Sequence, residues 1–261
     1  MTESVKVSRT DGIALVVLNR PQAFNAFDLE MVTRMADALG SLSADSSVRA
    51  VVLTGEGKAF CAGGDLKWAA AFSGGPPAGF HQLAGRFHQA VLEIRRMPKP
   101  VVAAIGGVAA GGGFSLALAC DFRVLAASAT LRQAYTSSGL CIDGGGTFTL
   151  PRLVGLARAL EIAALDRPIS AEQALGWGLA TRVVKDGSAL EEAMQLARGL
   201  TAISTHSFGW AKQLLTDSFD SSFETQLERE RRGLAVCAAH PDGQEGLQAF
   251  RERRKPKFPV G

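Results

Sequence analysis

The chain has 261 residues and a net charge of +3, and it is 47% hydrophobic and 20% charged. These values are typical of a globular enzyme with one large core, and the charge is too small to indicate a nucleic-acid partner. The amino-terminal residues are polar and lack the apolar run of a signal peptide. The longest apolar run, over 101–120, is about half glycine and alanine, which favours a buried strand, loop and helix over a membrane span.

The cysteines indicate a reducing compartment. Each stands singly in apolar or glycine-rich surroundings, and no C-x-x-C pair occurs among Cys61, Cys120, Cys141 and Cys237. Zinc sites and redox motifs use closely spaced cysteines, so the sequence gives no support for a metal site or a thiol–disulfide motif. We therefore expect free thiols, a cytoplasmic location and no membrane partner.

Short apolar runs and amphipathic stretches alternate from the beginning of the chain. Residues 12–20 and 48–55 predict strands, and Asp28 is placed to cap a helix between them. The apolar side chains of that helix form one stripe, which consists of Val32, Met35, Ala36 and Leu39. Residues 56–68 predict a loop that leads into another helix.

A glycine- and proline-rich break over 73–79 precedes a predicted helix over 80–96. One face of this helix is apolar, with Phe80, Leu83, Phe87, Val91 and Ile94. Strands are predicted over 101–105 and 122–127, on either side of a glycine-rich loop that opens a helix. Strands that alternate with helices favour a layered α/β fold with crossover connections.

The pattern changes after residue 150, where helices predominate. Ser170 with Gln173, and Ser221 with Glu224, have the spacing of a capping box. Helices are predicted over the stretches 188–200, 205–215 and 222–240. The chain is therefore predicted to have an α/β core over residues 1–195 and a helical carboxyl-terminal region over 196–261.

Two segments, 50–66 and 100–116, each contain an apolar run, a glycine-rich loop and the start of a helix. Neither matches the dinucleotide motif G-x-G-x-x-G or a P-loop. Two such loops can direct two backbone N–H groups at one oxygen, as in an oxyanion hole. Close packing of the helices explains the glycines equally well, so the spacing alone leaves both interpretations open.

Three long segments carry a family resemblance: "AFCAGGDLK" at 59–67, "PKPVVAAIGGVAAGGGFSLALACDFRV" at 98–124 and "GGGTFTLPRLVGLARALEI" at 144–162. In these residues, and from 16 to 258 overall, the chain resembles the crotonase (enoyl-CoA hydratase/isomerase) superfamily. The resemblance implies a crotonase-like ββα spiral core over residues 1–195 and a helical trimerisation region over 196–261. It implies an acyl-CoA thioester substrate and homotrimers that often pair into hexamers. It implies no metal and no cofactor other than the coenzyme A of the substrate.

The resemblance also implies site residues. The backbone N–H groups of Gly64 and Gly112 are the implied oxyanion donors. Basic residues in the closing segment 251–258 are implied to meet the phosphates of coenzyme A. The implied substrate-binding residues are Ala23, Ala62, Gly64, Asp65, Leu66, Lys67 and Ser115.

The chain departs from the hydratases of this family at the two positions where they carry catalytic glutamates. Ser115 and Tyr135 occupy these positions, which argues against classical hydration. With both glutamates absent, Asp143 is the remaining carboxylate near the two glycine-rich loops that could act as the base. Its apolar neighbours in the sequence favour the raised pKa that a base needs. Family members with aspartate here include isomerases of aromatic-acid catabolism and 4-chlorobenzoyl-CoA dehalogenases, in which it is the nucleophile. The alternative role for Asp143 is to cap the helix that follows it.

Two further side chains are candidates for the site. His88 matches the position of the water-activating histidine of the dehalogenases, and its alternative role is that of a packed or interfacial histidine. Tyr135 either lines the acyl pocket or is a core aromatic residue whose hydroxyl is hydrogen-bonded.

The favoured hypothesis is an enoyl-CoA isomerase, in fatty-acid or aromatic-acid metabolism, in which Asp143 moves a proton through an enolate. The alternatives within the family are an enoyl-CoA hydratase, which is a lyase, and a hydrolase or dehalogenase with Asp143 as nucleophile. A serine hydrolase is a rival of another class, because Ser115, Asp143 and His206 have the chain order of an α/β-hydrolase triad. A non-catalytic or RNA-binding homologue is the remaining alternative. The modest charge and the lack of interleaved aromatic and basic residues disfavour it, so no nucleic-acid partner is expected.

Overall fold

The computed structural model describes residues 3–258 of the chain, and it contains two sheets that share one core. The first sheet has the strand order β1–β2–β3–β5–β7–β10, and the second has the order β4–β6–β8–β9. The strands of the first sheet are β1 (Val5–Thr10), β2 (Ile13–Leu18), β3 (Ala50–Gly55), β5 (Val101–Ile105), β7 (Phe122–Ala126) and β10 (Arg182–Val184). Those of the second are β4 (Ala59–Cys61), β6 (Val108–Ala110), β8 (Thr130–Arg132) and β9 (Ile169–Ser170).

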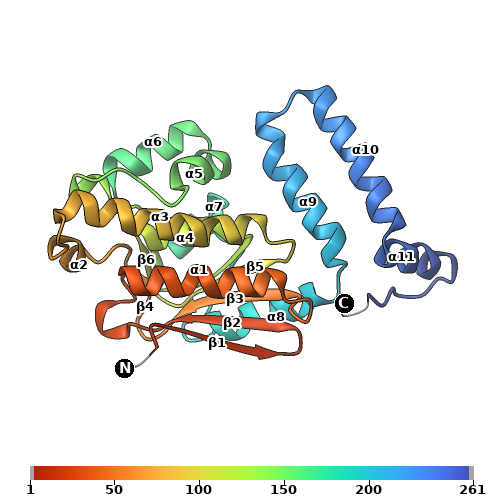
Figure 1. Cartoon of the computed structure of the whole chain (residues 1–261), viewed down its shortest axis with the longest axis horizontal. Coiled ribbons are helices and arrows are strands. Elements are labelled where there is room, and N and C mark those ends of the chain that lie inside the picture. The colour runs from red at the N-terminus through yellow and green to blue at the C-terminus, as the bar shows by residue number, and fades with distance from the viewer. Residues whose placement is uncertain (1–2, 259–261) are drawn as a thin grey trace.

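A repeated ββα unit builds the core. Each of β3, β5 and β7 is followed by a short strand of the second sheet and then by a helix, and β3, β5 and β7 pair in parallel. The helices of the core are α1 (Leu29–Ala44), α2 (Leu66–Ala70), α3 (Gly75–Arg96), α4 (Gly112–Ala119), α5 (Gly146–Val154), α6 (Leu156–Leu165), α7 (Ala171–Gly176) and α8 (Ala189–Thr201). Figure 1 shows α1 and α3 side by side on one side of the strands β1, β2 and β3. The predicted ββα spiral core with a helical carboxyl-terminal region is thus confirmed.

The apolar stripes predicted from the sequence face this core. The Asp28 carboxylate caps α1 by accepting from Met31 N at 2.9 Å, and the four predicted stripe residues of α1 are buried. Every residue of α4 is buried, which explains its run of glycine, alanine and leucine. None of the helices in the described part of the chain is both long and apolar enough to cross a membrane.

Two sequence predictions about helix starts were wrong. The stretch 73–79 is not a break throughout, because α3 begins at Gly75 and takes Pro76 and Pro77 into its first turn. Proline is tolerated there because its missing N–H would have no partner in the first turn. Ser222, not Ser221, caps α10 by accepting from Thr225 N. The capping box of Ser170 and Gln173 is confirmed.

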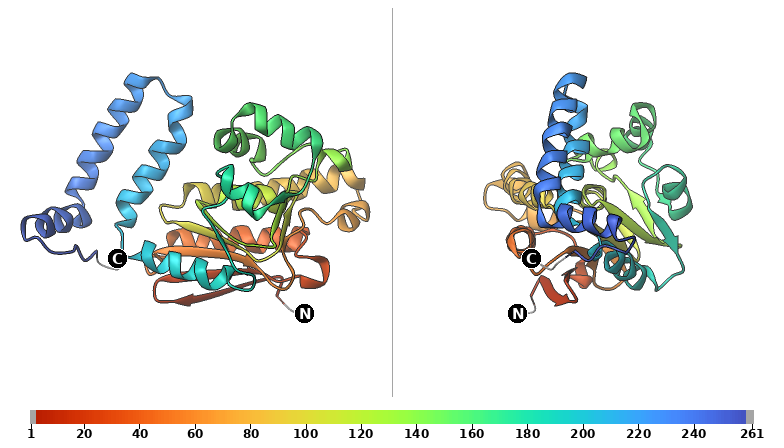
Figure 2. Two further views of the ribbon diagram at one scale, coloured as in Figure 1. Left: turned by 180° about the vertical axis from the view of Figure 1, so that it is seen from behind. Right: turned by 90° about the vertical axis from the view of Figure 1, so that its right-hand side faces the viewer.

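The last three helices form an arm that projects from the core (Figures 1 and 2). They are α9 (Thr205–Asp217), α10 (Phe223–Ala239) and α11 (Pro241–Arg251). The preceding helix, α8, spans residues 195 and 196 and packs on the six-stranded sheet through Ala193 and Ala197. The arm therefore begins after α8, at Thr205.

A buried ion pair fastens the arm to the core. Lys212 of α9 lies 2.8 Å from the Asp121 carboxylate and donates to the Ile94 carbonyl at 2.7 Å. The side chains of Lys212 and Asp121 are only 5% and 9% exposed. Removing one member of such a pair leaves the other buried without a counter-ion, which is costly.

We expect Lys212→Met to lower the free energy of unfolding by about 3–5 kcal/mol, because it leaves the Asp121 carboxylate buried and unpaired. Urea denaturation of the two proteins measures the difference. Arg34→Met is the control, since Arg34 pairs with Glu30 on the exposed face of α1 and should change stability by less than about 1 kcal/mol. Equal effects of the two substitutions would contradict the anchoring role of Lys212.

Candidate active site

A cavity of about 610 Å³ lies between α3, the loops that precede α2 and α4, and the segment 134–143. Its walls are mainly apolar and aromatic. The lining residues that the sequence predicted are Ala62, Gly64, Leu66, Gly112, Tyr135 and Asp143. Asp143 is the only carboxylate in this lining among the described residues.

The two glycine-rich loops meet at this cavity because the strands that precede them are neighbours. β4 pairs in parallel with β6, so their carboxyl ends lie at the same edge. The approach is close: a Cβ atom on Gly63 would lie 2.8 Å from the Gly112 nitrogen. Gly63 has φ +91°, a conformation that glycine adopts without strain. The predicted convergence of the two loops is therefore present.

The backbone N–H groups of Gly64 and Gly112 are among those left without an acceptor in these loops. Gly63 N–H donates to Cys61 Sγ at 3.3 Å, Asp65 N–H to Phe27 O at 2.8 Å and Gly111 N–H to Arg132 O at 3.1 Å. Within residues 3–258, Gly64 and Gly112 donate no hydrogen bond. Gly112 is the first residue of α4, where the N–H has no partner within the helix. These two donors can bind an oxygen that gains negative charge.

Asp143 lies in the cavity wall, which contains no other carboxylate among the described residues. Its own environment is partly apolar. Burial raises the pKa of its carboxyl, and the hydrogen bond from Tyr135 and the nearby His88 lower that pKa only in part. The net direction is upward. A carboxylate with a raised pKa is a stronger base than an exposed one, which suits proton abstraction.

Tyr135 is tied to this base. Its hydroxyl donates a short hydrogen bond to Asp143 Oδ1. The ring is 8% exposed, and burial together with the Asp143 carboxylate raises the pKa of the phenol. Tyr135 therefore remains a neutral donor, and it both lines the cavity and holds the carboxylate.

His88 reaches the same loop from α3. Its Nε2 accepts from Gly144 N–H at 3.2 Å and lies 3.9 Å from Asp143 Oδ2. The imidazole thus contacts the backbone of the Asp143 loop without a direct hydrogen bond to the carboxylate. The alternative role of Asp143 as a helix cap is wrong, because Gly145 is the residue that caps α5 and no side chain bonds to that end of the helix.

A serine-hydrolase triad is not formed. The Ser115 hydroxyl is buried inside α4 and is not part of the cavity lining. His206 lies in the arm and stacks on His240 with ring centroids 3.9 Å apart. Hydrogen bonds therefore do not join Ser115, Asp143 and His206 in the described structure.

The other predicted substrate-binding residues are not part of the cavity lining. Lys67 is exposed next to the lining residue Leu66, while Ala23 is half-buried in the short helix η1 (Pro21–Ala23). Asp65 has a structural contact: it caps α2 and accepts from Arg20 at 3.0 Å. Burial works to raise the pKa of Asp65, but the Trp68 N–H and the Arg20 guanidinium lower that pKa below its usual range.

Much of the cavity wall was missed by sequence reasoning. Phe80, Leu83 and Phe87 were assigned to the apolar face of a helix, and this face of α3 also lines the cavity. The remaining lining residues are Phe27, Pro76, Pro77, His81, Ala84, Gly111, Ala134, Ser138, Leu140 and Cys141. The spacing of Phe80 and Phe87, two turns apart, was the available signal for a shared face.

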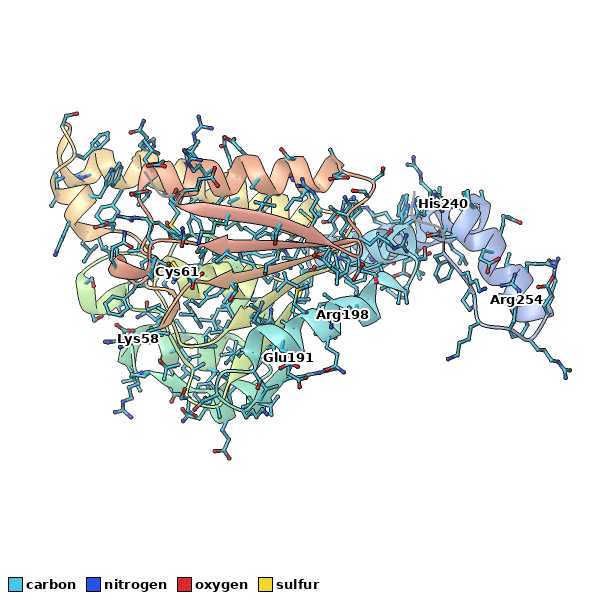
Figure 3. The ribbon with its side chains drawn as sticks, turned by 90° about the horizontal axis from the view of Figure 1, so that it is seen from below. Lys58, Cys61, Glu191, Arg198, His240 and Arg254 are labelled. Atoms are coloured by element: carbon cyan, nitrogen blue, oxygen red, sulfur yellow. The ribbon has the colours of Figure 1, made fainter. Side chains whose placement is uncertain are left out.

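The basic closing segment lies away from the cavity of its own chain. Arg254 binds Glu245 and Glu252 at the end of the arm. Figure 3 shows Arg254 at the opposite end of the molecule from Cys61, which precedes the first glycine-rich loop. Within residues 3–258, no three His, Cys, Asp or Glu side chains gather as metal ligands.

Comparisons with known proteins found similar sequences and a similar fold. Residues 8–260 match the family model "Enoyl-CoA hydratase/isomerase". The chain is 38% identical over 248 residues to 1,2-epoxyphenylacetyl-CoA isomerase from Escherichia coli K12, with 95% of each chain covered. It is 34% identical over 250 residues to 4-chlorobenzoyl coenzyme A dehalogenase-2 from an Arthrobacter species, with 95% of this chain and 91% of the relative covered.

A solved structure with the same fold is that of an enoyl-CoA hydratase from Polaromonas sp. JS666. It superposes with a TM-score of 0.93 at 35% sequence identity, and 98% of this chain and 99% of that chain are covered. The three similar proteins thus carry three different activities.

Proposed function

The chain belongs to the enoyl-CoA hydratase/isomerase family and is an acyl-CoA enzyme of that family, and from this premise we propose that it is an enoyl-CoA isomerase with a single catalytic base. The observation that carries the proposal is one partly buried carboxylate, Asp143, in a cavity that also contains the free N–H groups of Gly64 and Gly112. The E. coli relative, named as an isomerase, supports the same reaction class.

The proposed mechanism is a proton transfer through an enolate. The thioester oxygen of the substrate accepts hydrogen bonds from Gly64 N–H and Gly112 N–H. Asp143 removes a proton from the carbon next to the carbonyl, and the electron pair that is released becomes a dienolate with its charge on that oxygen. The same carboxyl then returns the proton two carbons further along, which moves the double bond into conjugation. Each fixed oxyanion donor contributes about 3 kcal/mol by precedent.

Binding of the coenzyme A portion is proposed for the rim of the cavity. Ala62 and Leu66 line its wall, Lys67 is exposed beside them, and Ala23 lies in the preceding loop segment. An ammonium group at Lys67 can neutralise a phosphate of coenzyme A. The reaction proposed here uses only groups of this chain and the substrate, so we propose that no cofactor is needed.

Hydration is less well supported than isomerisation. Classical hydration by this family uses two glutamates to hold and activate water, and Ser115 and Tyr135 stand at those positions. Ser115 is buried within α4, and Tyr135 is a neutral donor that already binds Asp143. Neither residue can therefore take a proton from water at neutral pH.

A nucleophilic role for Asp143 is the second candidate. It is supported by the dehalogenase relative and by His88, which lies 3.9 Å from Asp143 Oδ2. An aromatic acyl group would also find Phe27, Phe80 and Phe87 in the cavity wall. Single-turnover reactions in H₂¹⁸O distinguish the candidates, because attack of water on the carboxyl carbon of an aspartyl ester leaves one ¹⁸O in Asp143 and an unlabelled oxygen in the product, whereas proton transfer leaves no ¹⁸O in Asp143.

The direct test of the isomerase proposal is exchange of the α-protons of an acyl-CoA into deuterated water, together with isomerisation of 3-enoyl-CoA to 2-enoyl-CoA. We expect both in the wild-type protein. Strong hydration of 2-enoyl-CoA without isomerisation would contradict the proposal.

The exchange rate should depend on pH through Asp143. The base works only as the carboxylate, so kcat/KM should rise with pH as Asp143 loses its proton. Because burial raises the pKa of Asp143, the midpoint of this rise should lie above 3.8, the ordinary value for aspartate. A pH series of α-proton exchange measures it, and a flat profile from pH 4 to 8 would contradict the role of Asp143 as base.

We propose that copies of this chain assemble through the arm, as the trimers and hexamers of the family do. Large apolar side chains are exposed along α9, α10 and α11, among them Leu215, Phe223, Leu234 and Phe250. Apolar exposure on this scale favours a protein interface. In such an assembly, the basic segment 251–258 of one copy is free to meet the coenzyme A bound by another.

A further inference from the structure

The turn that carries Tyr135 is strained. Ala134 has φ +53°, a conformation that residues with a side chain rarely adopt. Its N–H donates to Asp166 Oδ1 at 2.7 Å. Asp166 also has a positive φ, +46°, and is only 6% exposed. Conformations of this kind persist where surrounding contacts hold them, and they cluster at functional sites.

Asp166 links three segments that are separate in the sequence. It ends α6, where its N–H donates to Ile162 O at 3.1 Å. Arg132, at the end of β8, donates from Nε to Asp166 O at 3.0 Å and to Asp166 Oδ1 at 3.3 Å. Burial works to raise the pKa of Asp166, but hydrogen bonds from Ser137 and Ala134 and the Arg132 guanidinium lower that pKa, so the carboxyl stays ionised at neutral pH.

The held turn leads directly to the proposed base. Tyr135 N–H donates to Oε1 of the fully buried Gln133 at 3.1 Å. Gln133 Nε2 in turn donates to Ala163 O of α6 at 3.2 Å. The Tyr135 hydroxyl then donates to Asp143 Oδ1. No other described residue donates a hydrogen bond to Asp143 Oδ2, so Oδ2 is the oxygen available to take a proton.

We propose that Asp166 is a positioning residue for the base. It holds the Ala134–Tyr135 turn and thereby places the Tyr135 hydroxyl against Asp143 Oδ1. Through this contact it sets the pH at which Asp143 Oδ2 accepts a proton. This inference rests on the proposed function, because the ionisation of Asp143 decides the rate only if its carboxylate takes part in the reaction.

The charged and titratable groups that face Asp143 are few. Tyr135 faces it from the turn before η2 (Thr136–Ser138), and His88 faces it from α3. The hydrogen bond from Tyr135 favours the carboxylate, so its loss must raise the pKa of Asp143. Asp166 does not contact Asp143, so it can change this ionisation only through Tyr135.

The test is a pH titration of aspartate carboxyl carbons by ¹³C NMR, which requires no turnover. The Asp143 signal is assigned by its loss in Asp143→Asn. We expect Tyr135→Phe to raise the Asp143 midpoint by about 1 pH unit, because one hydrogen bond to a charged group is lost. Asp166→Gly should raise it in the same direction and by no more than Tyr135→Phe, since glycine keeps the positive φ but removes the carboxylate.

Two further variants separate positioning from general disruption. Asp166→Asn should keep the wild-type midpoint, because asparagine tolerates the positive φ and its Oδ1 can accept from Ala134 N–H. The double variant with Tyr135→Phe and Asp166→Gly should titrate like Tyr135→Phe alone. Asp186→Ala is the matched control, since Asp186 also accepts a backbone N–H, from Ser128 at 2.8 Å, but on the loop after β10.

A wild-type Asp143 midpoint in Asp166→Gly would overturn the inference, as would a shift that adds to that of Tyr135→Phe. The proposed function fails separately: absence of α-proton exchange in the wild-type protein would refute the base role, while the same NMR shifts would still establish that Asp166 acts on Asp143 through Tyr135.

Discussion

Asp143→Asn is expected to lower the rate of α-proton exchange and of 3-enoyl to 2-enoyl isomerisation by about 10²–10⁴-fold, the usual contribution of a positioned general base. Asparagine has nearly the same shape and can still accept a hydrogen bond from Tyr135, so the cavity should remain intact. What is lost is the only carboxylate in the cavity lining of the described chain. The measurement is exchange into deuterated water, followed by mass spectrometry of the acyl-CoA.

The control for this variant is Asp186→Asn, which changes an aspartate outside the cavity and should leave exchange unchanged. KM for the acyl-CoA should change little in Asp143→Asn, because the N–H groups of Gly64 and Gly112 still bind the thioester oxygen. Normal exchange in Asp143→Asn would remove Asp143 from the role of base. Retained isomerisation in Asp143→Asn would contradict the assignment in the same way, whether or not exchange is lost.

The main strands and long helices could be predicted because their signals are local. β5 and β7 are short apolar runs, and their side chains are buried or nearly so. The apolar stripe of α1 follows the helical repeat and faces the core. The short strands β4, β6, β8, β9 and β10 were missed because each has two or three residues, which is too short for a periodic pattern.

The site was predictable to a smaller extent. Gly64, Gly112 and Asp143 lie within contiguous motifs, so the sequence could point to them, and the geometry then brings them to one cavity. Asp166 could not be found in this way, because its contact with Ala134 joins residues 32 positions apart. Its positive φ is a property of the folded backbone, and aspartate at that position gives only a weak indication of it.

The oxyanion hole is the second feature on which the mechanism depends, and Gly112 is the position where it is most sensitive. A Cβ atom on Gly112 would lie 3.0 Å from Phe27 Cε2, which is closer than side chains normally pack. The Phe27 ring is 2% exposed and lies 4.9 Å from the Phe87 ring, so it has little room to move away. The start of α4 must therefore shift by a few tenths of an ångström, which moves the N–H that it presents.

We expect Gly112→Ala to lower kcat/KM by about 10²-fold, because oxyanion donors act at 2.7–3.1 Å from the charged oxygen and lose most of their effect when displaced. The loss should be mainly in kcat, since the charge on the oxygen develops only in the transition state. Gly85→Ala is the matched control: no atom lies within 4 Å of the added Cβ, so it should raise stability by up to about 1 kcal/mol and leave kcat/KM unchanged. If Gly112→Ala kept more than half of the wild-type kcat/KM, the result would contradict the role of Gly112 N–H as an oxyanion donor. The enolate charge would then have to be stabilised by other groups.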